Sequence, residues 1–285
     1  MIRDLSPDEF PPLLREINDP PKALRYEGEL PIPENKLLVV VGSRKYSHYG
    51  REVCEALIAG LAGYPITIVS GLAIGMDSIA HRAALKAGLQ CVAVPGSGLS
   101  RKVMHPRTNV NLAEEIIESG GGLLSEFPDD RSAAIWTFPQ RNRIMAGMSH
   151  ATIIVEAENK SGTLITSRLA TEYNREVGAV PGPVISSTSD GPHMLIRLGA
   201  ALIRDSKDIL ELLGLKQDEK DKVLFDINDL TEEEKIFISI LESPCSRDEL
   251  IRQSNLDSGK AMAILSLLEI KGLIFEELGE IRKTF

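Results

Sequence analysis

The strongest constraint on the fold is a short apolar run that recurs five times, each time followed within a few residues by glycine or serine. The runs are 37–42 (LLVVVG), 66–71 (ITIVSG), 91–96 (CVAVPG), 151–157 (ATIIVEA) and 177–182 (VGAVPG). Their apolar residues are continuous rather than alternating, which is typical of strands buried on both faces of a parallel sheet. The segments between them have helical spacing and often end in glycine. This alternation predicts a doubly wound α/β domain with a mostly parallel sheet.

The chain divides into four predicted parts. Residues 1–35 are proline-rich and polar, and they predict a short N-terminal lead-in. Residues 36–215 contain the apolar runs and form the predicted α/β domain. Residues 216–228 are charged and lack helix-stop signals, so they predict a linker. Residues 229–285 predict a second, smaller domain.

The C-terminal part has the pattern of a winged helix. Thr231 followed by Glu234, and Ser246 followed by Glu249, have capping-box spacing and predict two helix starts. A third, largely apolar helix is predicted next, and two short β-like pieces flank Gly279. Three helices with a small hairpin predict a winged-helix domain.

Composition excludes several classes of protein. The chain of 285 residues is long enough to fold without a covalent staple, burying roughly 70–75% of its unfolded surface. Cys54, Cys91 and Cys245 lie far apart with no C-x-x-C pair, which excludes a disulfide framework and a thiolate zinc site. No apolar run reaches the ~18 residues of a membrane span, and the acidic N-terminus is unlike a signal peptide. We expect a cytoplasmic protein without membrane insertion, metal site or cofactor.

The charge balance limits how the chain could bind a polyanion. With 32 basic and 41 acidic residues the net charge is −9, which excludes a basic coat over the whole surface. Residues 1–215 hold 22 basic and 25 acidic residues (−3), and residues 216–285 hold 10 and 16 (−6). Binding of a polyanion would therefore need a local basic patch or backbone amides in the first part of the chain.

Four predicted strands end in loops with residues suited to phosphate. These loops contain Gly42-Ser43-Arg44, Ser70-Gly71, Pro95-Gly96-Ser97-Gly98 and Ser161-Gly162-Thr163. Glycine lets a ligand approach the backbone, arginine binds phosphate with two hydrogen bonds, and a helix N-terminus favours an anion. For any one loop the alternative is a plain tight turn, but four loops at one sheet edge favour a shared groove. Neither a Walker motif nor a dinucleotide fingerprint is present.

A second cluster lies at residues 136–143, where the sequence reads WTFPQRNR. Aromatic rings can stack on bases, arginines can hold phosphates and asparagine can contact base edges, a combination suited to single-stranded nucleic acid. The alternative is a helix cap with Phe138 in the core. Lys160, Arg168 and Arg175 could extend the same face, although each alone could be a solvated charge.

Signatures of catalysis are sparse. The five histidines form no H-x-x-x-H or H-E-x-x-H pattern, and no G-x-S-x-G elbow occurs. Glu126 and Glu156 could act as acids or bases, but structural roles are preferred for both. Glu126 precedes a proline turn, and Glu156 is expected to position the Ser161 loop.

Read together, these motifs resemble the DNA-processing protein A family (DprA, also called Smf). The resemblance covers about residues 36–205 and rests on VGSRKYSHYG, IVSGLAIGMDSIAHRAAL, GGLLSEFP, FPQRNRIMAGMS and the segment from IIVEA to AVPGP. The C-terminal part resembles the family's winged-helix domain more loosely. The lead-in is shorter than the helical N-terminal domain of many members, and Pro192-His193-Met194 replaces a usual asparagine.

The resemblance implies an extended Rossmann-like domain that binds single-stranded DNA, dimerises, and delivers the strand to the RecA recombinase during natural transformation. It implies no catalysis. The implied DNA-binding residues are Gly42, Ser43, Arg44, Ser70, Gly71, Phe138, Arg141, Asn142, Arg143, Ser161, Gly162 and Thr163, to which we add Lys160.

Two other functions remain as alternatives. Nucleoside-monophosphate phosphoribohydrolases have a related fold and a glutamate in P-G-G-x-G-T-x-x-E, but here Thr166 stands in the position of that acid. A transcription regulator would need a basic recognition helix, whereas the predicted third helix of the winged-helix domain carries only Lys260 and Lys271. That domain is therefore expected to have a protein-contact or accessory role.

Overall fold

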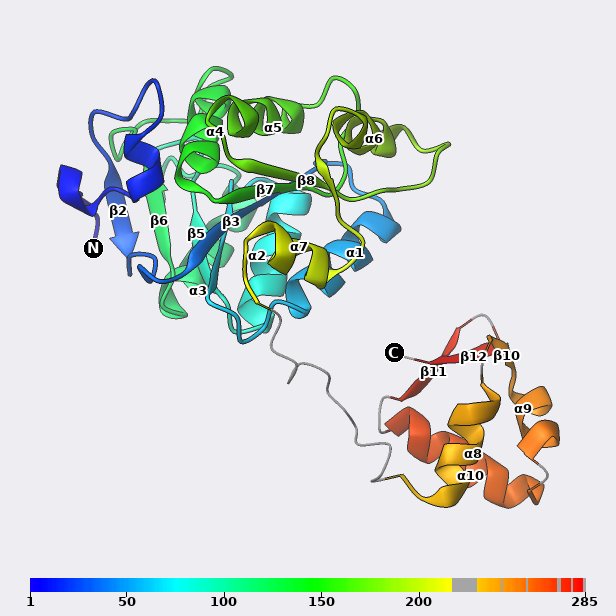
Figure 1. Cartoon of the computed structure of the whole chain (residues 1–285). Coiled ribbons are helices and arrows are strands. Elements are labelled where there is room, and N and C mark those ends of the chain that lie inside the picture. The colour runs from blue at the N-terminus through cyan, green and yellow to red at the C-terminus, as the bar shows by residue number, and fades with distance from the viewer. Residues whose placement is uncertain (217–229, 242, 255, 271–272, 278, 284–285) are drawn as a thin grey trace. The chain divides into compact units, whose positions relative to one another are not determined.

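The computed structural model describes residues 1–216, 230–241, 243–254, 256–270, 273–277 and 279–283 (Figure 1). The chain divides into two compact units, Met1–Gln217 and Asp218–Phe285, and each is described on its own. The predicted linker, 216–228, lies outside the described residues except for Lys216.

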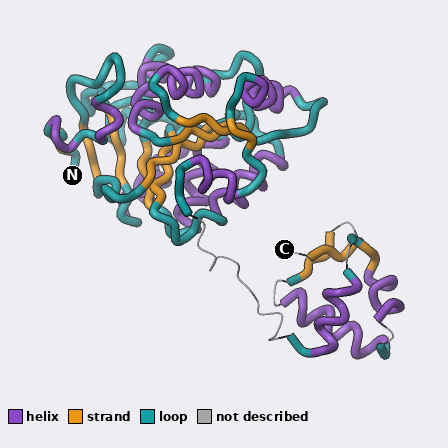
Figure 2. The backbone as a smooth tube through the Cα atoms, viewed as in Figure 1, coloured by secondary structure: helices purple, strands orange, loops and turns teal. Residues whose placement is uncertain are grey.

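A nine-stranded sheet forms the centre of the first unit (Figure 2). In spatial order its strands are β1 (Arg3–Asp4), β2 (Arg25–Gly28), β6 (Gly122–Ser125), β5 (Gln90–Ala93), β4 (Ile66–Ser70), β3 (Lys36–Val41), β7 (Ala151–Ile154), β8 (Glu176–Ala179) and β9 (Ala201–Leu202). The seven strands from β6 to β9 are parallel, and β1 and β2 are antiparallel additions at one edge. The predicted mostly parallel α/β sheet is confirmed.

The strand order reverses beside β3. From β3 the chain proceeds through β4, β5 and β6 toward one edge, and then returns to place β7, β8 and β9 on the other side of β3. Such a reversal leaves a crevice beyond the carboxyl ends of the two central strands, where ligands bind in open α/β sheets. The loops that follow β3 and β7 are therefore the first place to look for a site.

Helices cover both faces of the sheet. On one face lie α1 (His48–Ala59), α2 (Met76–Lys86), α3 (Val110–Glu118) and α7 (Ser206–Leu212), and on the other lie α4 (Thr137–Met148), α5 (Thr163–Glu172) and α6 (Asp190–Arg197). Strand β3 shows why its run is continuously apolar, because Leu38 and Val40 pack into one core cluster while Val39 and Val41 pack into the other. Both faces of this strand are buried, as a parallel central strand requires.

Residues 1–35 do more than lead into the sheet. They form β1, β2 and two 3-10 helices, η1 (Pro7–Glu9) and η2 (Pro12–Arg15). Leu14, Leu24 and Tyr26 are fully buried in the same cluster as α4. The segment is thus an integral part of the first unit. Its short apolar stretches between prolines give no periodic signal, and only the tertiary contacts make them strands and core.

The second unit has the predicted winged-helix shape. It contains α8 (Glu232–Ile240), α9 (Arg247–Ser254), α10 (Ser258–Ile270) and a sheet of β10 (Cys245–Ser246), β12 (Glu280–Lys283) and β11 (Ile274–Glu277). The capping box at Thr231 is present: the Glu234 amide donates to the Thr231 hydroxyl at 3.3 Å, and the Thr231 amide donates to the Glu234 carboxylate at 3.0 Å. Within the described part of the chain, no helix has both the length and the apolar character needed to cross a membrane.

Candidate nucleic-acid interface

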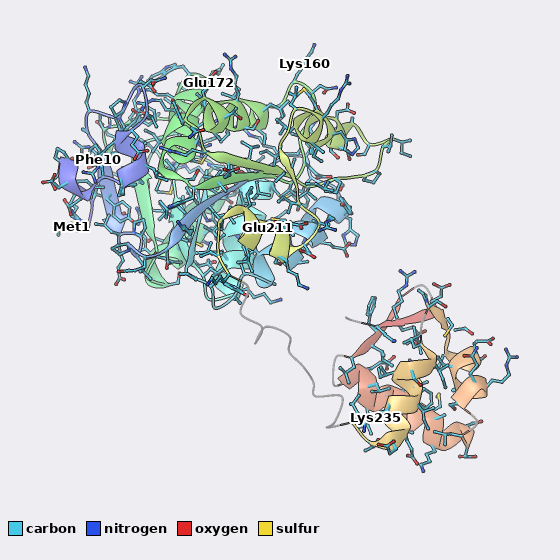
Figure 3. All side chains as sticks on the ribbon, in the orientation of Figure 1. Met1, Phe10, Lys160, Glu172, Glu211 and Lys235 are labelled. Atoms are coloured by element: carbon cyan, nitrogen blue, oxygen red, sulfur yellow. The ribbon has the colours of Figure 1, made fainter. Side chains whose placement is uncertain are left out.

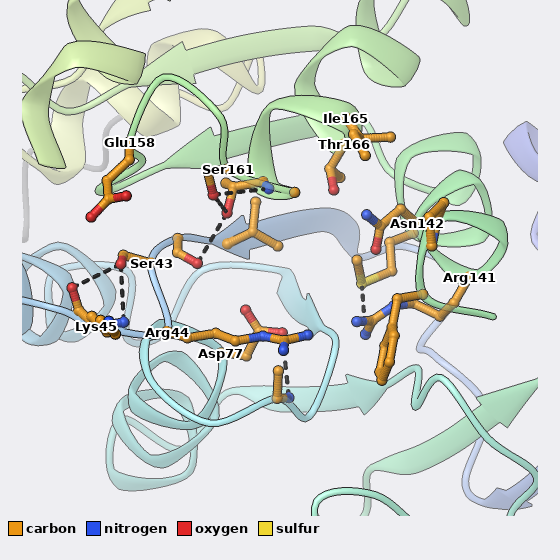
Figure 4. Close-up of a pocket in the computed structure, with 18 of the residues that line it drawn as sticks. Ser43, Arg44, Lys45, Asp77, Arg141, Asn142, Glu158, Ser161, Ile165 and Thr166 are labelled. Carbon is orange, nitrogen blue, oxygen red and sulfur yellow. Dashed lines mark hydrogen bonds between the residues drawn. The ribbon is translucent and has the colours of Figure 1, made fainter. Parts of the chain in front are cut away.

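A pocket of about 580 Å³ lies at the reversal of strand order, between the β3–α1 loop, the β7–α5 loop and the start of α4 (Figure 4). Its lining consists of Val41, Gly42, Ser43, Arg44, Lys45, Ala73, Asp77, Ile135, Phe138, Pro139, Arg141, Asn142, Met145, Glu158, Ser161, Gly162, Thr163, Ile165 and Thr166. The cationic side chains Arg44, Lys45 and Arg141 face two carboxylates, Asp77 and Glu158. The described residues contain no group of three or more histidine, cysteine, aspartate or glutamate side chains placed to hold a metal ion.

The β3–α1 loop presents Arg44 to the pocket. Ser43 is buried, and its hydroxyl donates to the Lys45 carbonyl at 2.8 Å and accepts from the Lys45 amide at 3.0 Å, so it fixes the turn. Gly42 is needed because a Cβ there would lie 2.7 Å from Cγ of Met76. Arg44 is exposed, and it has no ion pair among the described residues. The loop therefore holds a charged guanidinium that is free to bind an anion.

Arg141 and Asp77 form the buried floor of the pocket. Arg141 is 5% exposed, and its Nη1 donates to the Val94 carbonyl at 2.6 Å. Asp77 is 7% exposed, and it accepts from the amides of Gly71 at 3.1 Å and Ala73 at 3.4 Å. The Asp77 carboxylate thus holds the β4–α2 loop in place.

The two buried charges act on each other. Burial raises the pKa of Asp77, and the neighbouring Arg141 opposes that rise. Burial lowers the pKa of Arg141 to about 10, and Asp77 opposes that fall. Since about 10 is well above neutral pH, Arg141 stays charged there, and its positive charge contributes to the field in the pocket.

Phe138 supplies the aromatic surface of the pocket. Its ring packs against Gly96, where a Cβ would lie 2.6 Å from Cδ1 of the ring. The Arg44 guanidinium carbon lies 5.2 Å from the centre of the ring, within the range of a cation–π contact. The position is fixed by Thr137, whose buried hydroxyl donates to the Gly96 carbonyl at 2.6 Å. A base could stack here beside a guanidinium that binds its phosphate.

The β7–α5 loop closes the opposite wall. The Ser161 hydroxyl accepts from the Thr163 amide at 3.2 Å, and the Thr163 hydroxyl donates to the Gly42 carbonyl at 3.0 Å. The second bond joins the two loops on either side of the strand reversal, as the dashed lines in Figure 4 show. A Cβ on Gly162 would meet nothing within 4 Å, so this residue leaves the pocket wall open.

Nine of the thirteen predicted binding residues line this pocket, and four do not. The nine are Gly42, Ser43, Arg44, Phe138, Arg141, Asn142, Ser161, Gly162 and Thr163. Ser70 is fully buried and its hydroxyl donates to the Val40 carbonyl at 2.7 Å, while Gly71 lies beneath the Arg141 guanidinium. Lys160 is exposed on the loop before α5 and points outward (Figure 3), so it does not reach the lining.

Arg143 is the fourth residue outside the lining, and its partners explain why. Its guanidinium forms ion pairs with Glu126 and, at 3.3 Å, with Asp19, and it donates to the Asp19 carbonyl at 2.6 Å. Glu126 thus has a structural role, but as the partner of Arg143 rather than through a turn. Glu156 was expected to hold the Ser161 loop; instead it accepts from the Ser47 amide at 2.9 Å and from the Thr188 hydroxyl at 2.9 Å.

Sequence reasoning missed several lining residues that a helical pattern could have found. Met145 follows Arg141 by four residues and Asn142 by three, and these two follow Phe138 by three and four, so all four share one face of α4. Thr166 follows Thr163 by three residues on α5 in the same way. Ile135 and Glu158 lie on loops and had no such signal.

Comparison with known proteins gives a consistent assignment. Residues 2–214 match the family model described as DNA recombination-mediator protein A, and residues 228–279 match that of the DprA winged helix domain. Protein Smf of Escherichia coli is 45% identical over 204 residues, which are 72% of this chain and 54% of that protein. The DNA processing protein DprA of Streptococcus pneumoniae is 41% identical over 203 residues, 71% of each chain. This chain therefore spans about half the length of the E. coli relative.

Two solved structures share the fold of the first unit. DprA from Streptococcus pneumoniae superposes with a TM-score of 0.70 at 38% identity, over 76% of this chain and 75% of that one. DprA from Helicobacter pylori, described for its mode of binding single-stranded DNA, gives a TM-score of 0.67 at 27% identity, over 75% of this chain and 95% of that one. Matches of this extent and identity show that the chain belongs to the DNA recombination-mediator protein A (DprA/Smf) family.

Proposed function

We propose that the protein binds single-stranded DNA without regard to sequence, with the strand lying in the pocket at the reversal of strand order. The observation that carries this proposal is the pairing of the exposed Arg44 guanidinium with the Phe138 ring, 5.2 Å apart in an otherwise acidic molecule. Unpaired bases expose the faces that such a ring can stack on, whereas a duplex hides them. The description of the H. pylori relative as a single-stranded DNA-binding protein supports the same function.

The proposal is tested by measuring the affinity for labelled single-stranded and duplex oligonucleotides of equal length. The expected result is a clear preference for the single strand. Arg44→Ala should weaken single-strand binding about tenfold or more, since a charge-assisted contact and a cation–π partner are lost together. Arg82→Ala is the matched control, because Arg82 is an exposed arginine on α2. Helix α2 covers the face of the sheet opposite to α4, which carries Phe138. Equal affinities of the two variants would overturn the placement of the strand.

Within a cell, we propose that binding protects incoming single strands and loads the RecA recombinase during natural transformation, which places the protein in the cytoplasm. The names of the relatives as DNA processing and recombination-mediator proteins support this role. The test is filament formation by RecA on single strands coated with a single-strand-binding protein. Addition of the wild-type protein should accelerate filament formation, whereas addition of the Arg44→Ala variant should leave its rate unchanged.

We also propose a homodimer formed at the α6–β9 edge of the sheet. Strand β9 is the last strand of the sheet, and its Leu202 is 45% exposed. Leu198, which directly follows α6, is 76% exposed. Sedimentation of the wild-type protein should give a dimer mass, and Leu198→Glu should shift it toward the monomer, since a charge cannot be buried there without cost. A monomeric wild-type protein would exclude this assembly.

Hydrolysis of nucleotides is the alternative function. Thr166 lines the pocket where the related hydrolases have a glutamate, and the Asp77 carboxylate is engaged by two loop amides. These observations favour a binding protein without catalysis. Incubation with AMP, followed by detection of free adenine, distinguishes the two functions, and we expect no adenine above the level of a protein-free control.

A further inference from the structure

Beyond the pocket, the start of α4 presents a second aromatic ring together with a second arginine. Trp136, the chain's single tryptophan, is 49% exposed. The Arg131 guanidinium carbon lies 4.9 Å from the centre of the indole ring. This pair repeats the geometry of Phe138 and Arg44, whose separation is 5.2 Å. The two rings are separated along the chain by only Thr137, and neither Trp136 nor Arg131 belongs to the pocket lining.

The indole ring is held in place by its neighbours. Phe127, which is buried, packs against it edge to face, with ring centres 5.8 Å apart and planes at 81°. The next residue, Thr137, is anchored by its bond to the Gly96 carbonyl. A half-exposed aromatic ring that is fixed in this way can stack on a partner with little loss of side-chain entropy.

Exposed apolar side chains line the pocket, and one of them is next to this ring in the chain. Ile135 lines the pocket and is 92% exposed, and it directly precedes Trp136 in the chain. Ile165, on the opposite wall, is 41% exposed. Exposed apolar side chains at the mouth of a charged pocket suit a ligand that has both phosphates and flat apolar faces, and a nucleic acid strand leaving the pocket would cross Ile135 to reach Trp136.

The local charge permits an anion at this place. Arg131 is exposed and forms no ion pair among the described residues. Of the two neighbouring carboxylates, Asp129 forms an ion pair with Arg25 at 3.0 Å, and only Asp130 stays exposed. The positive charge of Arg131 is therefore available to a phosphate, with one nearby acid opposing it.

We propose that Trp136 and Arg131 form a second nucleotide-binding subsite, in which a base of the strand leaving the pocket stacks on the indole and Arg131 binds an adjacent phosphate. This inference rests on the proposed single-strand binding and extends it, since it lengthens the bound strand beyond the pocket. The ligand of the second subsite is the same single strand of nucleic acid that Arg44 and Phe138 bind in the pocket.

The test measures affinity as a function of strand length. Oligothymidylates of about 4 to about 16 nucleotides cover the usual site sizes of single-strand-binding folds. Wild-type protein should gain affinity at the length that reaches Trp136, and its tryptophan fluorescence should change at that same length. Trp136→Ala should lose this gain, a weakening of about 5- to 150-fold for long strands at ~1–3 kcal/mol per stacked base. Short strands confined to the pocket should bind both proteins equally.

Controls separate stacking from folding. Trp136→Phe should keep part of the length-dependent gain, because a smaller ring can still stack. Phe275→Ala removes another exposed aromatic ring, 41% exposed in the second unit, and should change nothing. Arg131→Ala should reduce the gain and the salt dependence, with Arg82→Ala as its matched control. Thermal melting checks that each variant is folded.

The outcomes also separate this inference from the function on which it rests. If Arg44→Ala weakens binding but Trp136→Ala equals wild type at every length, the second subsite is wrong and the proposed pocket stands. If wild-type protein binds no single strand, the proposed function and the subsite fail together.

Discussion

At the scale of single residues, the site depends on a close approach between Gly71 and Arg141. A Cβ on Gly71 would lie 1.7 Å from Nη1 and 2.4 Å from Cζ of the guanidinium. The arginine cannot simply move aside, because it is buried and bonded to the Val94 carbonyl. Gly71 was predicted to contact DNA, but in the structure its small size makes room for the residue that forms the floor of the pocket.

Gly71→Ala is therefore expected to destabilise the fold by about 1–3 kcal/mol, the usual cost of overpacking a core site. Urea unfolding measures the change, and binding of a single strand should weaken as well because Arg141 is displaced. Gly162→Ala is the control for stability, since a Cβ there has open space and its φ of −59° suits alanine. Equal unfolding midpoints for the two variants would contradict this account of Gly71.

Burial of His81 predicts that the stability of the fold depends on pH. Its side chain is fully buried on α2, and burial lowers its pKa to about 4, with the Arg141 charge acting in the same direction. Because the unfolded histidine has an ordinary pKa near 6.5, the unfolded state binds more protons between pH 6.5 and 4. The stability that neutral His81 contributes is thus complete above pH 6.5 and is lost as the pH falls through that interval.

The free energy of unfolding should fall by up to about 3 kcal/mol over this interval because of His81. His81→Leu, which cannot titrate, should show a smaller fall between pH 7 and pH 4.5 in urea titrations. His48→Gln should keep the wild-type slope, because His48 is exposed at the start of α1. Identical slopes for wild type and His81→Leu would mean that another group causes the pH dependence.

At the scale of whole elements, the described residues of the winged-helix unit have cations that are engaged by carboxylates. On α10, Lys260 forms an ion pair with Glu233. Arg247, at the start of α9, forms ion pairs with Glu269 at 2.6 Å and Glu276 at 2.7 Å. The pocket, by contrast, is built wholly from residues of the first unit.

Removal of residues 218–285 should therefore leave single-strand affinity within about twofold of wild type, as expected for parts that contribute independently. Titration of a labelled oligonucleotide against the full chain and against residues 1–217 measures this. A tenfold loss in the shortened chain would show that the winged-helix unit takes part in binding.

The elements also show how far sequence patterns reach. The five apolar runs predicted β3, β4, β5, β7 and β8, because burial on both faces leaves a continuous signal. The short strands β1 and β2 had no such signal, since they are stabilised by the pairing of β2 with β6 and of β1 with β2 rather than by their own sequence. Of the four loop motifs that the sequence indicated, those at 42–44 and 161–163 line the pocket, and residues 70–71 and 95–98 do not. The motifs could not show that Arg143 points to Glu126 and away from the pocket, because that depends on contacts distant in sequence.

At the scale of the whole molecule, a net charge of −9 opposes the approach of any polyanion. The exposed cations of the pocket, Arg44 and Lys45, must overcome this repulsion locally. We therefore expect that only a small number of phosphates is neutralised on binding, in contrast to proteins that wrap DNA with a basic surface.

The salt dependence of binding should be correspondingly modest. With two or three phosphates neutralised, the logarithm of the association constant should fall with the logarithm of salt concentration with a slope of about −1.4 to −2.1. Arg44→Ala should make the slope shallower by about 0.7. Anisotropy titrations over a salt series measure both values, and a wild-type slope near zero would argue against phosphate contacts in the pocket.

The bond from the Thr163 hydroxyl to the Gly42 carbonyl joins parts of the chain that are 121 positions apart. The pocket is consequently complete only when β7 lies beside β3 in the folded sheet. A ligand that binds in this pocket binds only the folded state and therefore stabilises it. Binding of DNA should thus raise the melting temperature of the entire first unit. A fragment that ends before residue 163 should show no rise in melting temperature when DNA is added, even if its remaining helices form.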